Sequence, residues 1–339
     1  MDGQYPTGRP GVAERTSPTD LVDATPQAEP RHLRDPRHVM LRDHTSQLVE
    51  ESRRAPQHWE LLRALGAAVL TPPPGNAEIC RGLDLPVPDG AEHTGVFVLG
   101  APPHAAIHLG PEGKLGGEGL DRVAGFWRAL GLRAPEDADH LGALLMLYAE
   151  LGGAESSTAD VEHADHLRRS RCALLHEHIW SWAPAYLVAV QGLGIDPIGQ
   201  WADLTLQVLR SEHDTADLPD QLPLALREAP EPLTATGTVD DALDALVAPV
   251  RTGMVLTQRD LQEGARLAAV GFRRGERRFA LRAMLEQDPV ATLDWLLGQA
   301  HRWADVHRRC GDDPTSRWWQ QRAAHTAATL EQMLAGARS

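Results

Sequence analysis

The sequence predicts an all-α protein, and three observations support this fold class. Apolar residues recur at steps of three and four along most of the chain after residue 45, which is the spacing of one face of a helix. Prolines and glycines separate these segments, where they end helices rather than continue them. Almost no segment has the alternation of a strand, and no fixed repeat indicates a solenoid.

The first half of the chain contains a polar segment and then a series of helices. Residues 1–44 carry six prolines and no periodic apolar face, so we expect disorder there. The stretch 84–117 is irregular, with a possible two-stranded ribbon formed by residues 96–99 and 105–107. A proline at position 184 should kink the longest helix. We expect helices over residues 45–71, 77–83, 119–130, 139–151, 157–191 and 197–212.

The second half predicts a linker and another helical block. Residues 213–238 are rich in proline and acids, which is typical of a linker. Helices are then expected over residues 239–247, 257–270, 275–285, 289–308 and 314–334. The predicted organisation is a disordered segment (1–44), a helical domain (45–212), a linker (213–238) and a C-terminal helical block (239–339).

Composition excludes several classes of protein. The formal net charge is −14, whereas a general nucleic-acid binder usually carries a basic balance. Three widely spaced cysteines do not suggest a disulfide framework. We find no apolar run near the ~20 residues that cross a bilayer, and no signal peptide. A cytoplasmic protein without membrane insertion is therefore expected.

The sharpest local pattern is Pro135-Glu136-Asp137-Ala138-Asp139-His140, which opens an apolar helix. Asp139 is well placed to be the N-cap of that helix, because its carboxylate can accept hydrogen bonds from the free N–H groups of the first turn. Glu136 lies where the positive end of the helix dipole favours an anion. His140 is expected at the first helical position. Helix capping is the simplest interpretation of these acids.

A second pattern runs from Leu174 to Tyr186 and contains two histidines. His176 and His178 are two residues apart, which places them on different faces of a helix and argues against a metal site. No phosphate loop, dinucleotide fingerprint or nucleophile elbow occurs in the chain. We therefore expect no catalytic residue, no metal site and no cofactor. The basic segment 273–278 is interpreted as a solvated turn.

These motifs together resemble the TorD/DmsD/NarJ family of molybdoenzyme chaperones, over residues 55–212. The family has a Glu-x-x-Asp-His signature at the start of a buried helix, an aromatic residue before Gly-Leu upstream, and a Leu-x-x-His-Leu-x-x-Trp-x-Pro-x-Phe run downstream. The matching residues are Glu136, Asp139, His140, Phe126, Trp127, Gly131, Leu132, Leu175, His178, Trp182, Pro184 and Tyr186. The chain departs from the family at Leu144, where glutamate is common, and lacks a Ser-x-Tyr near residues 110–115.

The resemblance implies a chaperone that binds the apo form of a molybdopterin-containing oxidoreductase, its twin-arginine signal peptide, or both. Such a chaperone assists cofactor insertion and prevents premature export without making bonds itself, as a monomer or a homodimer. The resemblance assigns client binding to Asp139 and His140 with Glu136, and to His178; for Trp127 and Trp182, core packing is an equal alternative. Two other functions stay open: a non-catalytic assembly subunit of an oxidoreductase, and a metal-dependent helical enzyme.

Overall fold

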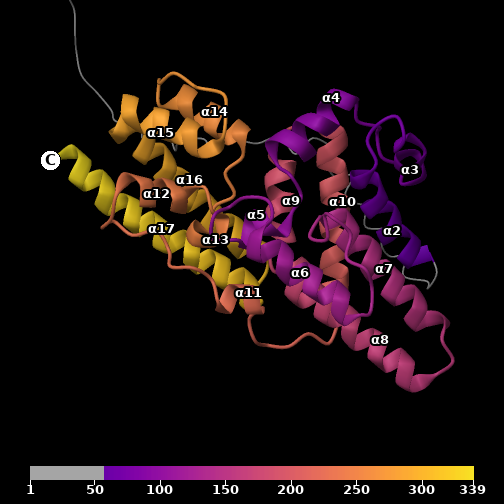
Figure 1. Cartoon of the computed structure of the whole chain (residues 1–339). Helices are drawn as coiled ribbons and strands as arrows, with labels where there is room; N and C mark the ends of the chain where they lie inside the picture. The colour runs from indigo at the N-terminus through magenta and orange to yellow at the C-terminus, as the bar shows by residue number, and fades with distance from the viewer. Residues whose placement is uncertain (1–56) are drawn as a thin grey trace, which may run out of the picture. The chain divides into compact units, whose positions relative to one another are not determined.

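The computed structural model describes residues 57–339, and every regular element among them is a helix (Figure 1). The expected all-α class is confirmed. The only extended pairing in this range is an isolated bridge between His104 and His140. The expected disorder of residues 1–44 and the beginning of the first expected helix lie outside the described residues. No helix in residues 57–339 combines the length and apolarity needed to cross a bilayer.

The first described helices surround a Pro-rich turn and an irregular stretch. They are α2 (Gln57–Leu70), α3 (Ala77–Gly82), α4 (Gly90–His93), the π-helix η1 (Thr94–Gly100) and α5 (Ala105–Leu109). The ribbon prediction was wrong, because residues 96–99 belong to η1 and residues 105–107 to α5. Periodicity alone does not separate a short apolar run in a strand from a buried helical turn.

The next helices form most of the first core. They are α6 (Gly117–Ala129), α7 (Leu141–Ser157), α8 (Val161–Ala173), the π-helix η2 (Leu174–Trp180), α9 (Ala183–Gln191) and α10 (Asp196–Thr215). The single helix expected over residues 157–191 is therefore wrong. The chain breaks before α9, where Trp182 has φ −148° and ψ −31°. Pro184 lies in the first turn of α9, where its missing N–H costs no helical hydrogen bond.

Helices α2 and α7 lie against each other (Figure 1). They pack very closely, because glycines face each other at their crossing. A Cβ built on Gly66 would lie 2.6 Å from the carbonyl oxygen of Gly142, and a Cβ on Gly142 would lie 2.6 Å from that of Gly66. A Cβ on Gly152 would lie 2.4 Å from the ring of Trp59. The contact therefore requires the absence of side chains at these positions.

The C-terminal part continues with short helices and ends in two long ones. The elements are α11 (Leu224–Arg227), α12 (Val239–Leu246), α13 (Pro249–Thr252), α14 (Gln258–Leu267), α15 (Arg277–Gln287), α16 (Pro289–Cys310) and α17 (Pro314–Arg338). Thr238 and Thr257 start α12 and α14 with capping boxes, and Asp313 caps α17. Figure 1 shows α16 and α17 lying along each other.

Two hydrophobic cores hold the described residues together within one compact unit. The first core is built mainly from α2, α7, η2, α9 and α10, and the second mainly from α12 and from α14 to α17. The residues expected to form a linker are packed rather than extended into solvent. Ala225 and Leu226 are buried in the first core and Leu233 in the second. The domain boundary at residues 213–238 stays a prediction.

Candidate functional site

The acidic motif before α7 forms a buried contact with the start of α5. Asp139 is 2% exposed. Its Oδ2 accepts a hydrogen bond from the Ala106 N–H at 2.8 Å, and its Oδ1 lies 3.1 Å from His104 Nδ1. The backbone oxygen of Asp139 also accepts from the Ala105 N–H at 3.1 Å. The N-cap prediction for Asp139 was wrong: its carboxylate binds the first turn of α5, not the first turn of α7.

His140 is the actual N-cap of α7. Its Nδ1 accepts a hydrogen bond from the Gly142 N–H at 3.0 Å, and the helix begins one residue later, at Leu141. The imidazole rings of His104 and His140 meet edge to face with centroids 5.0 Å apart. We call His104, Asp139 and His140 the clamp, because they fasten the start of α5 to the start of α7.

The electrostatics of the clamp follow from burial and from its hydrogen bonds. Burial alone would raise the pKa of Asp139, but the hydrogen bonds from His104 and from the Ala106 N–H outweigh it, so the pKa is lowered. The pKa of His140 is lowered to about 4, mainly by burial. The charge of His104 also lowers this pKa, by more than the carboxylate of Asp139 raises it. At neutral pH the clamp therefore contains an ionised carboxylate and a neutral His140, as an accepting Nδ1 requires.

Trp127 and Glu136 are the predicted site residues with side chains that reach solvent. Trp127, on α6, is half-buried, and its Nε1 donates to the carbonyl oxygen of Ala138 at 3.2 Å. Glu136 is exposed on the loop between α6 and α7, where Leu132 is also 42% exposed. Trp127 thus fixes the loop that presents Glu136.

His178 and Trp182 are buried beneath this region. His178 lies in η2 and packs against Phe126 of α6, with ring centroids 4.8 Å apart. Burial, and then the charge of Arg122, lower the pKa of His178 to about 4. Trp182 is 1% exposed and donates from Nε1 to the backbone oxygen of His178 at 2.8 Å. Neither side chain meets solvent, so each would act by supporting the surface above it.

A buried histidine that the sequence did not single out completes the support. His108 of α5 stacks on Trp182 with centroids 4.9 Å apart, and it contacts Tyr186 edge to face. Burial, followed by the charges of Arg277 and His104, lowers the pKa of His108 to about 3. His104 and His108 precede Asp139 by more than thirty residues. No local pattern in the sequence connects them to Asp139.

An open cavity lies between α5, α6 and the segment around α11. Arg122 of α6 forms an ion pair at 3.4 Å with Glu228, across the cavity. The lining residues are Leu109, Gly110, Pro111, Glu118, Gly119, Arg122, Ala225, Glu228 and Pro230.

The comparison with protein families concerns the part of the chain that contains this site. Residues 90–187 match the family model of the nitrate reductase delta subunit. This match confirms the resemblance to the NarJ/TorD-type chaperones, a family that acts in molybdoenzyme maturation. It covers less than a third of the chain. No curated protein and no solved structure matches the chain.

The matched residues, which we call the delta-subunit segment, include all the predicted site residues. They run from the start of α4 into α9 and contain the clamp, Trp127, Glu136, His178 and Trp182. The structure brings Trp127, Glu136, Asp139 and His140 together at one loop. It places His178 and Trp182 one layer below, against Phe126 and His108. The C-terminal block lies outside the segment.

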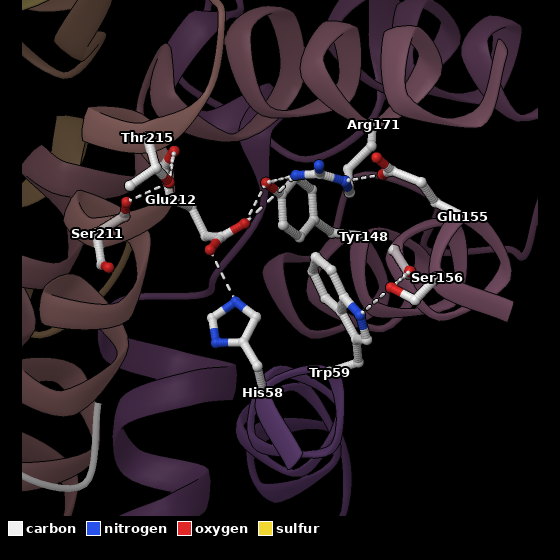
Figure 2. A network of polar contacts seen from close by, with 10 residues as sticks. His58, Trp59, Tyr148, Glu155, Ser156, Arg171, Ser211, Glu212 and Thr215 are labelled. Atoms are coloured by element: carbon white, nitrogen blue, oxygen red, sulfur yellow. Dashed lines mark hydrogen bonds and ion pairs between the residues drawn. The ribbon is translucent and has the colours of Figure 1, made fainter. Parts of the chain in front are cut away.

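A second polar cluster, which sequence reasoning missed, ties the delta-subunit segment to helices before and after it. Figure 2 shows Glu212 of α10 between His58 of α2 and Tyr148 of α7. Glu212 Oε1 lies 2.7 Å from His58 Nε2, and Tyr148 donates to Oε2 at 2.6 Å. Arg171 of α8 donates to the Tyr148 oxygen at 2.7 Å and pairs with Glu155 at 2.8 Å. Four helices therefore share one network.

The hydrogen bonds of this network hold the four helices together. Burial alone would raise the pKa of Glu212, but hydrogen bonds from His58 and Tyr148 outweigh it and lower the pKa. A glutamate on the largely apolar buried face of α10 was the available signal in the sequence. Within residues 57–339, no three His, Cys, Asp or Glu side chains are grouped so as to hold a metal ion.

Proposed function

We propose that this protein is a cytoplasmic chaperone for a molybdopterin-containing oxidoreductase. It binds the apo form of that enzyme, its twin-arginine signal peptide, or both, and it assists cofactor insertion and delays export without catalysing a reaction. The observation that carries the proposal is the delta-subunit segment, which holds an exposed acidic loop rigidly above a buried clamp.

The loop between α6 and α7 is the proposed contact surface. Glu136 and Asp137 are exposed there next to Leu132 and the half-buried Trp127. Carboxylates beside apolar side chains suit a client segment that carries arginine next to apolar residues. Asp139 and His140 act as positioning residues, because both are buried and hold the loop in place.

The experiment is a pulldown from cells that express the client oxidoreductase in apo and cofactor-loaded forms. The wild-type protein should retain the apo form and lose it once the cofactor is inserted. Glu136→Gln should weaken retention several-fold, because a rim charge contributes to attraction. The matched control is Glu286→Gln, which removes an exposed charge from α15.

Two outcomes distinguish an error in the proposed function from an error in the proposed contact surface. If the wild type retains no apo-oxidoreductase, the chaperone function is wrong. If Glu136→Gln and Glu286→Gln bind equally well, the function stands but the contact surface lies elsewhere.

A second function, a non-catalytic assembly subunit, is favoured by one observation. Most of the second core comes from helices that follow the delta-subunit segment, α12 and α14 to α17, although Ala185 of the segment also belongs to it. These additional helices give the chain further surface for docking. An assembly subunit would copurify with the mature, cofactor-containing enzyme, whereas a chaperone would be released from it.

A further inference from the structure

Residues 223–233, which we call the strap, line the open cavity together with residues of α5 and α6 from the delta-subunit segment (α11 is labelled in Figure 1). The strap contains the single turn α11 with the sequence Leu-Ala-Leu-Arg at residues 224–227. Ala225 is 3% and Leu226 is 2% exposed, and both belong to the first core. Although the strap lies outside the matched family segment, it covers part of that segment's apolar surface.

The strap is held on the delta-subunit segment by few polar contacts. The Leu224 N–H donates to Glu177 Oε2 at 2.6 Å, and Glu228 pairs with Arg122 at 3.4 Å. Both carboxylates retain solvent exposure, 26% for Glu177 and 59% for Glu228. Solvent-exposed ion pairs contribute little to stability, so the burial of Pro223, Ala225 and Leu226 provides most of the attachment.

The other end of the strap is held by the C-terminal block through backbone oxygens. Arg322 donates to the oxygen of Pro230 at 3.2 Å, and Arg251 Nε donates to that of Glu231 at 3.1 Å. His325 Nε2 lies 3.1 Å from the oxygen of Leu233. These contacts tie residues 230–233 to the C-terminal block.

The surface beneath the strap, which we call the strap site, combines charge with apolar area. It consists of Leu109, Glu118, Gly119, Arg122 and Glu177. Two carboxylates and one guanidinium leave it with an excess of negative charge. The strap buries Ala225 and Leu226 against the first core, and the exposed Arg227 follows them directly; this sequence indicates what else the site can bind.

We propose that the strap is an internal placeholder, and that an apolar segment of the apo-client with an adjacent arginine binds the strap site by displacing it. This inference rests on the proposed chaperone function and names the surface and the client chemistry. A tethered segment competes at a high effective concentration. The apparent affinity for the client is therefore the affinity of the open form multiplied by the fraction of molecules in which the strap is open.

The test uses a fluorescent peptide with the sequence of residues 219–233 and the full-length protein. Leu226→Ala removes the largest side chain that the strap buries in the first core. Leu224→Pro removes the N–H that donates to Glu177, at the first position of α11 where proline is tolerated, and leaves the strap site itself unchanged. Both variants should bind the peptide at least about tenfold more tightly than the wild type, because their own strap is open more often. Leu243→Ala, buried in the second core, controls for general destabilisation.

The second measurement titrates the apo-oxidoreductase into the complex of the peptide and the Leu224→Pro variant. Displacement of the peptide, together with tighter binding of the client to both strap variants than to the wild type, supports the inference. Client binding without displacement overturns it and leaves the chaperone function intact. If no form of the protein binds the client, the function fails together with the inference. Equal peptide binding by wild type and both variants would show that the strap does not open.

Discussion

The carboxylate of Asp139 binds the first turn of α5, a helix distant in sequence from α7, before which Asp139 stands. Its donors are His104 and the backbone of Ala106, so it stabilises α5 while the adjacent His140 caps α7. The local sequence predicts that Asp139 caps a helix. Which helix it caps was not predictable, because the competing donors come from more than thirty residues upstream.

His140 should make the stability of the protein depend on pH. Its pKa falls from 6.5 to about 4 on folding, so between these values the unfolded chain binds a proton that the folded chain does not. The free energy of unfolding should therefore decrease as the pH falls from about 6.5 towards 4, by on the order of 3 kcal/mol for this residue.

Urea unfolding between pH 7 and pH 4 measures this dependence. His140→Asn keeps a side chain that can accept the Gly142 N–H but does not titrate. Its stability should fall less steeply with acid than that of the wild type. Parallel curves for the two proteins would contradict the assignment of a neutral, buried His140.

At the scale of elements, the crossing of α2 and α7 depends on glycine. Gly66→Ala would place a methyl group 2.6 Å from the backbone oxygen of Gly142, and backbone cannot move aside as a flexible side chain can. We expect a loss of about 1–3 kcal/mol in the free energy of unfolding, as in overpacked cores.

The control for this variant lies on α7 itself. A Cβ on Gly153 meets nothing within 4 Å, so Gly153→Ala should stabilise the helix by up to about 1 kcal/mol. Thermal unfolding of both variants tests the pair. If the Gly66→Ala and Gly153→Ala variants melted at the same temperature, the close packing of α2 against α7 would not depend on glycine at position 66.

At the scale of the whole molecule, Arg277 links the C-terminal block to the delta-subunit segment. Its guanidinium donates to the oxygen of Leu256 at 3.1 Å and to that of Gly113 at 2.8 Å. Gly113 and Leu256 are buried, and burial lowers the pKa of Arg277. The C-terminal block thereby holds the loop that follows α5.

Arg277→Met should release this loop. Two buried carbonyl oxygens would lose their donor, so we expect a loss of about 1–3 kcal/mol and faster amide hydrogen exchange in residues 110–116. Arg274→Met, an exposed change three residues earlier, should alter neither. Unchanged exchange in Arg277→Met would show that the loop is held by other contacts.

Helical class and many helix boundaries follow from the sequence itself. Thr257 and Asp260 form the expected helix start, and the prolines at 72–74 end α2. These features depend on hydrogen bonds and backbone angles within a few residues, so local composition is sufficient. The resemblance of the central segment likewise rests on residues and spacings along the chain.

Tertiary structure alone decided the partners of the site residues. Asp139 faces α5, Trp182 stacks on His108, and the strap is packed rather than extended. The long helix expected over residues 157–191 is divided at Trp182, whose ring is buried in the core. Such outcomes depend on which distant surfaces meet when apolar area is buried, and no local periodicity contains that information.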